Sequence, residues 1–259
     1  MLGEGGRVKM NPLETSAVVF ACTFGGAMVG VALHNVLPEN HLSSESKDVV
    51  KMGMGLVATM TALVLGLLVS SAKTSYDAQS NEVTDMAAKI VVLDRALAHY
   101  GPETKELRGR VRQVVADAAY RIFPEGGGAA DLKPDASRGG ALLDAIQQLE
   151  PKDEQQKSMK AFAVSMALSV TQERWLMYEQ QVVQVSLPML VIVVFWLSML
   201  FLSFGIYAPW NGTVTTALLA AALAVSGAIF LILEMYVPFG GLIHISNAPL
   251  KAALEFLGK

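Results

Sequence analysis

Seven residues in one apolar segment have the types and spacing expected of an ion path across a membrane. They recur at steps of three, four and seven residues and therefore share one face of a helix: Met52, Gly55, Thr59, Gly66, Ser70, Lys73 and Asp77. Small and hydroxyl residues leave room for water, and Lys73 contributed by several copies of the chain would concentrate anions at the inner mouth. The alternative, which the residue types alone favour, is that Gly and Thr allow close packing between membrane helices.

Glu234 is the single formal charge between Gln180 and Lys251. An acid inside a membrane is costly, so it suggests a bound proton, a bound cation or a basic partner. The alternative is that Glu234 lies in hydrated lipid headgroups, because Pro238 follows closely. The four histidines lie far apart, and the lone Cys22 excludes an intrachain disulfide. We therefore expect no metal, no cofactor and no catalytic set, and we predict that the chain is not an enzyme.

Small residues in the first apolar segment are typical of close helix packing. Ala21 follows Ala17 by four residues and precedes Gly25 by four, and Gly26 and Gly30 are also four apart. This small-xxx-small pattern predicts a tight contact with another membrane helix or with another copy of the chain.

Composition predicts an all-α integral membrane protein with four membrane helices. Hydrophobic residues make up 53% of the 259 residues and charged residues only 17%. Four segments have the roughly 20 apolar residues that cross a bilayer. The predicted order is an N-terminal segment 1–15, span 16–37, outer loop 38–51, span 52–72, helical insert 73–181, span 182–207, outer turn 208–213, span 214–237 and interfacial tail 238–259.

The distribution of Lys and Arg predicts the orientation. Between Lys73 and Arg174 lie 14 of the 20 basic residues, whereas the first outer loop holds only Lys47 and Lys51. The positive-inside rule then places both termini and the insert in the cytoplasm. A net charge of -3 gives no basic surface for nucleic acid.

The insert is predicted to be a helical bundle. The second span should begin at Ser43, Ser44 or Ser46 and continue to Gly101-Pro102, and a further helix should cover 103–122 with Val114 and Ala118 on its apolar face. A short helix is expected over 142–149, and a long one from Pro151 into the third span. Asp94 and Arg108 are interpreted as solvated surface charges. The tail helix, 248–257, is expected to lie along the membrane surface.

Four stretches carry a resemblance to a known family. They read LPENHLSSESKD at 37–48, GLVATMTALVLG at 55–66, LDRALAHYGP at 93–102 and VPFGGLI at 237–243. The chain resembles the bacterial bestrophin-like membrane proteins, although Tyr236-Val237 stands where the family has Asp-Arg. The resemblance implies four spans and cytoplasmic helices in the bacterial inner membrane, in contact with lipids. It also implies a homo-oligomeric channel for inorganic anions. The alternatives are a membrane scaffold or sensor whose insert recruits a partner and, less favoured, a proton-coupled transporter that uses Glu234.

Overall fold

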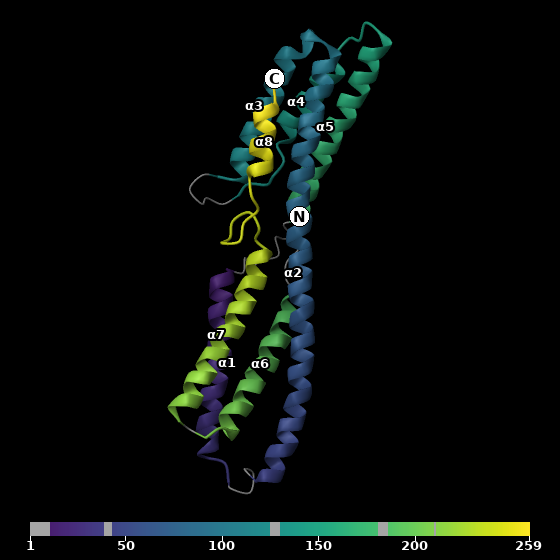
Figure 1. The fold of residues 1–259 in the computed structure, drawn as a ribbon. Helices are drawn as coiled ribbons and strands as arrows, with labels where there is room; N and C mark the ends of the chain where they lie inside the picture. The colour runs from purple at the N-terminus through teal and green to yellow at the C-terminus, as the bar shows by residue number, and fades with distance from the viewer. Residues whose placement is uncertain (1–10, 39–42, 125–129, 181–185, 210) are drawn as a thin grey trace, which may run out of the picture. The chain divides into compact units, whose positions relative to one another are not determined.

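The computed structural model describes residues 11–38, 43–124, 130–180, 186–209 and 211–259, and within these ranges all regular structure is helical (Figure 1). The elements follow one another as α1 (Pro12–His34), α2 (Ser44–Tyr100), a 3₁₀ turn (Pro102–Thr104), α3 (Lys105–Ile122), α4 (Ala136–Gln147), α5 (Glu154–Gln180), α6 (Leu187–Tyr207), α7 (Gly212–Met235) and α8 (Ala248–Phe256).

The chain divides into two compact units. We call residues 1–74 and 184–236 the membrane unit, and residues 75–183 and 237–259 the bundle unit. The first part of α2 belongs to the membrane unit and the rest of it to the bundle unit. Among the described residues, four helices are long and apolar enough to cross a membrane, and they are α1, α2, α6 and α7. The fold is that of a membrane protein with four such helices.

Helix α2 is a single helix of 57 residues. The Ser43 hydroxyl accepts a hydrogen bond from the Ser46 N–H at 3.3 Å and caps its first turn. At the other end Gly101 has a φ of 146°, a conformation that L side chains rarely adopt, and Pro102 begins the 3₁₀ turn. The predicted helix from the serine cluster to Gly101-Pro102 is confirmed.

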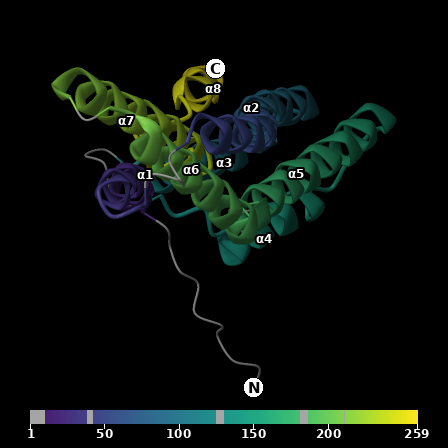
Figure 2. The same cartoon turned by 90° about the horizontal axis from the view of Figure 1, so that it is seen from below.

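Within the membrane unit, α1 packs closely on α6 and also contacts α7, as both views show (Figures 1 and 2). Helix α1 begins four residues before the predicted span, because the Asn11 side chain accepts the Leu13 N–H at 3.1 Å. The Asn11–Pro12 pair combines a capping side chain with a proline at the first helical position, where a missing N–H costs nothing.

The bundle unit has its own apolar core, to which the second part of α2 and α3, α4, α5 and α8 all contribute. On α3 the buried face includes Val115, whereas Val114 and Ala118, which were predicted to be buried, are only half-buried. The short fourth helix begins at Ala136 instead of Leu142, because Asp135 caps it by accepting the Arg138 N–H at 3.1 Å. The predicted continuation of α5 into α6 falls on residues 181–185, which lie outside the described residues.

The tail helix α8 packs within the bundle unit, beside α3 (Figure 1). Leu250, Ala253 and Leu257 are buried, with exposed fractions of 2%, 3% and 0%. The carbonyl of Lys259 accepts a hydrogen bond from Arg108 Nη2 at 2.8 Å. This side of α8 packs on protein, whereas Phe256 is 52% exposed. The placement of the tail along a membrane surface stays a prediction.

Candidate functional site

The α2 stripe, defined as the seven residues singled out for an ion path, is open in the structure. Asp77 is half-buried and the other six members are exposed: Met52, Gly55, Thr59, Gly66, Ser70 and Lys73. The sequence predicted a shared face, and the continuous helix places these residues on it.

The opposite side of α2 is the side that packs in the membrane unit. Between Ser44 and Thr74 the buried residues are Thr61, Leu68 and Ala72. Each follows a member of the α2 stripe by two positions, and two residues turn an α-helix by about 200°. Leu68 and Ala72 share a buried cluster with apolar side chains of α6 and α7. The α2 stripe therefore lies on the side turned away from the chain's own apolar helices.

The glycines of the α2 stripe do not serve close packing against any part of the chain that the structure describes. A Cβ atom added at Gly55 or Gly66 would meet nothing within 4 Å. The Thr59 hydroxyl donates to the Gly55 carbonyl at 2.9 Å, which satisfies this polar group within the helix. The packing interpretation of these residues then requires a surface that another molecule supplies.

Glu234 lies in the last turn of α7 and is 6% exposed. Its neighbours Ile232 and Leu233 belong to the buried cluster of the membrane unit. Nearby, the Tyr236 hydroxyl donates to the Ser71 hydroxyl at 3.1 Å and joins the end of α7 to α2. Because protein covers the Glu234 side chain, the side chain is not fully exposed to hydrated headgroups in this structure.

The two small-residue series of α1 have different environments. A Cβ added at Gly30 would lie 2.2 Å from the Leu202 carbonyl oxygen, and one added at Gly26 would lie 2.9 Å from that of Ser198, so both glycines face α6. In contrast, Ala21 is exposed and Gly25 has open space. The series with Gly26 and Gly30 makes the close approach, and the series with Ala21 and Gly25 makes none with the described residues.

Sequence reasoning missed the partner of this contact. A Cβ added at Gly205 of α6 would lie 2.1 Å from the carbonyl oxygen of Ala27 in α1, so Gly205 permits the close approach from the α6 side. Ser198 and Gly205 are seven residues apart and so share a helix face. This seven-residue spacing of small residues is the sequence pattern that could have predicted which face of α6 contacts α1.

The interpretation of Asp94 and Arg108 as solvated charges was wrong. Asp94 is 1% exposed, and its two carboxylate oxygens accept hydrogen bonds from Arg108 Nε at 2.8 Å and Nη2 at 2.7 Å. The Gly258 N–H also donates to Asp94, at 3.3 Å. Burial of this pair depends on the tail of the chain, which a local charge pattern on α2 does not reveal.

A second group of charges joins α2 to α5 in the bundle unit. Glu82 accepts a hydrogen bond from Gln180 at 2.6 Å, and Glu173 pairs with Lys89. Burial raises the pKa of Glu82, its hydrogen bond from Gln180 opposes that rise, and the charge of Glu173 adds to it. The described residues contain no group of three or more His, Cys, Asp or Glu side chains placed to hold a metal ion.

Comparison with known protein families identifies the family of this chain. The model of the bestrophin-like domain matches residues 21–250. The chain belongs to the bestrophin-like family. The match covers all four apolar helices in whole or in part and most of the bundle unit of this bestrophin-like protein. Searches of curated proteins and of solved structures returned no match.

Proposed function

We propose that this bestrophin-like protein is a homo-oligomeric ion channel that conducts anions, with the α2 stripe lining the pore. The observation that carries the proposal is the position of the stripe on the side of α2 opposite to Thr61, Leu68 and Ala72. Within the predicted span 52–72 this face holds Gly55, Thr59, Gly66 and Ser70, which are residue types that line pores or pack on other helices. Lys73 follows directly at the inner end of the span. Copies of the chain placed around a water-filled axis would give this face a suitable environment.

The exposure of α2 supports an assembly of several copies. In the most apolar 18-residue window of α2, 11% of the residues are buried, compared with 39% in α6. Helices in lipid associate through close packing and not through a hydrophobic driving force. The open space beside Gly55 and Gly66 would allow a neighbouring copy, or water in a pore, to approach the backbone of α2.

Lys73 supports anion selectivity. It is exposed and lies at the end of the membrane unit, four residues before Asp77. A ring of lysines beside a low-dielectric wall raises the local concentration of anions and lowers that of cations.

Current recordings from purified protein in planar bilayers test this function. We expect anion-selective currents, and Lys73→Glu should shift the reversal potential in a salt gradient toward cation selectivity. Lys105→Glu makes the same charge change on the exposed surface of α3 and should leave selectivity much closer to that of the original protein. Silent bilayers with intact oligomers, or equal shifts in the two variants, would contradict the proposal.

Steric block provides a second test at matched depth. Thr59 and Met60 are adjacent and exposed, but one residue turns the helix by about 100°. Thr59→Trp should reduce the current strongly, whereas Met60→Trp should reduce it little. Equal effects would exclude the α2 stripe as the pore lining.

A further inference from the structure

The bundle unit contains an apolar cavity of about 130 Å³ to which the channel proposal assigns no role. Side chains from α2, α3, α4, α5 and α8 line it. Its apolar walls include Met86, Ile90, Val111, Val115, Leu142 and Leu250. An apolar cavity of about 150 Å³ in another protein stays dry and holds benzene, so a cavity of this size fits a body of about six carbon atoms.

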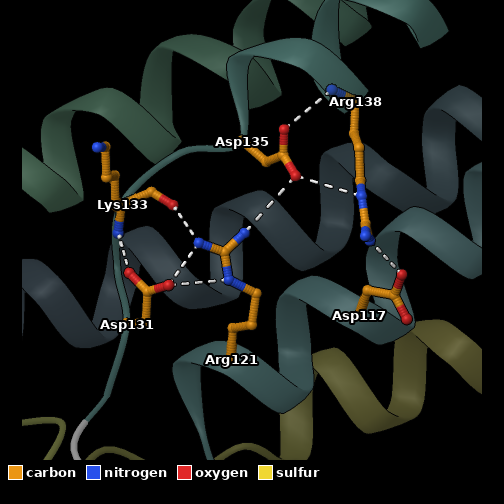
Figure 3. Close-up of polar contacts among 6 residues, drawn as sticks. All are labelled: Asp117, Arg121, Asp131, Lys133, Asp135 and Arg138. Carbon is orange, nitrogen blue, oxygen red and sulfur yellow. Dashed lines mark hydrogen bonds and ion pairs between the residues drawn. The ribbon is translucent and has the colours of Figure 1, made fainter.

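Charged residues gather at one part of the cavity wall, and Figure 3 shows two of its arginines with their partners. Arg121 donates to Asp131 through Nε at 3.0 Å, and its Nη1 lies 3.8 Å from Asp135. Arg138 pairs with Asp117 at 2.5 Å and with Asp135 at 3.2 Å. Both guanidinium groups therefore already have carboxylate partners within the protein.

The third arginine of the wall, Arg174 of α5, differs from the other two. Its Nη1 is buried and has no hydrogen-bond partner among the residues that the structure describes. Burial lowers the pKa of Arg174 and the charge of Arg121 acts in the same direction, while Asp131 opposes both. A guanidinium still remains charged at neutral pH. A buried donor without an acceptor destabilises a fold, so an added acceptor at this position would be favourable.

We propose that the cavity binds a small monocarboxylate whose apolar body is about the size of a benzene ring and whose carboxylate accepts a hydrogen bond from Arg174. The apolar walls match the body, and the buried Nη1 of the half-buried Arg174 matches the single charge. An inorganic anion would leave the apolar volume unfilled. A dianion would meet repulsion from the carboxylates of Asp117 and Asp135, which both line this part of the wall.

The Asp117–Arg138 ion pair marks a route into the cavity. Both residues also line a second, more open hollow of about 310 Å³ beside Arg110 and Gln113. The side chains of the pair are 47% and 55% exposed. An exposed ion pair contributes little to stability, so its opening to admit a ligand is not costly.

Fluorine NMR of 4-fluorobenzoate, titrated with the full chain in detergent, tests the proposal. We expect saturable broadening of the fluorine signal. Gly139 lines the cavity and has open space around its Cβ position, so Gly139→Leu should fill the cavity and abolish the broadening. Gly140 has the same open space but is not part of the lining, and Gly140→Leu should preserve binding. Absence of saturable broadening, or equal binding by both variants, would overturn the proposal.

The charge requirement is tested separately with Arg174→Met, which keeps much of the side-chain length. Loss of one charge-assisted hydrogen bond corresponds to about a tenfold or greater weakening, so the affinity for 4-fluorobenzoate should fall by that factor. Fluorobenzene has the same body without the carboxylate, and its affinity should be nearly unchanged by this substitution, which also verifies that the cavity remains formed. Equal affinity of the original protein and the variant for 4-fluorobenzoate would show that Arg174 does not bind the carboxylate of the ligand, and it would overturn the proposal.

Discussion

Helix α2 has the same regular geometry in both units but different surroundings in each. In the bundle unit it buries eight apolar side chains: Val83, Met86, Ala87, Ile90, Leu93, Ala96, Leu97 and Tyr100. In the membrane unit it buries only Thr61, Leu68 and Ala72. This difference indicates that the bundle part of α2 is stabilised by contacts inside one chain. The membrane part leaves most of its surface for lipid and, in the proposed assembly, for other copies.

The largest expected effect of substitution is at the buried ion pair of the bundle unit. Asp94→Ala leaves Arg108 without its carboxylate, and loss of one partner from a buried pair costs about 3–5 kcal/mol. Hydrogen exchange of the full chain in detergent should show faster exchange in α3 and α8. Glu106→Ala removes an exposed partner of Arg110 and should change exchange very little. Similar effects of the two substitutions would contradict the burial of Asp94.

The next effect compares the two parts of α2 directly. Leu97 is fully buried and Leu67 is 62% exposed. Leu97→Ala should lower the free energy of unfolding of the bundle unit by about 2–5 kcal/mol, because it removes buried methyl groups and leaves a cavity. Leu67→Ala should lower the free energy of unfolding of the membrane unit far less. Hydrogen exchange provides both values, and equal losses would mean that the membrane part of α2 is packed as tightly as the bundle part.

A smaller effect is expected at the contact between α1 and α6. Gly30→Ala places a methyl group against the Leu202 carbonyl, and such overpacking costs about 1–3 kcal/mol. Gly25→Ala, on the open side of the same helix, should be neutral or slightly stabilising, because Ala favours helix over Gly. Thermal aggregation of the purified variants in detergent measures the difference. A lower melting temperature for Gly25→Ala than for Gly30→Ala would contradict the assigned contact.

The smallest effect depends on pH. The pKa of Glu82 is raised above its usual value of 4.5, so its contribution to stability is present below that value and is lost as pH rises through the raised pKa. Glu82→Gln keeps the shape without the charge. The variant should therefore gain melting temperature relative to the original protein at pH 8 and gain less at pH 4. A larger gain at the lower pH would reverse the sign and exclude a raised pKa.

Local patterns predicted the elements well, and distant contacts account for what they missed. The serine cap and Gly101-Pro102 mark the ends of α2, and apolar length identifies the four membrane helices. The period of α2 also placed the α2 stripe on one face. Asp94 was misread because its partners include Gly258, which is far away in the sequence. The burial of α8 was missed for the same reason, since an apolar helix face fits a membrane surface and a protein core equally well.

Disulfide cross-linking between copies tests most directly whether the α2 stripe faces other molecules of the chain. In a Cys22→Ala background, Ser70→Cys places a thiol on the α2 stripe, and Ala72→Cys places one on the buried side of the same helix turn. Oxidation in native membranes should yield covalent dimers of the Ser70→Cys protein and none of the Ala72→Cys protein. Dimers from Ala72→Cys alone, or from neither variant although the oligomer is intact, would contradict the placement of the α2 stripe at a shared axis.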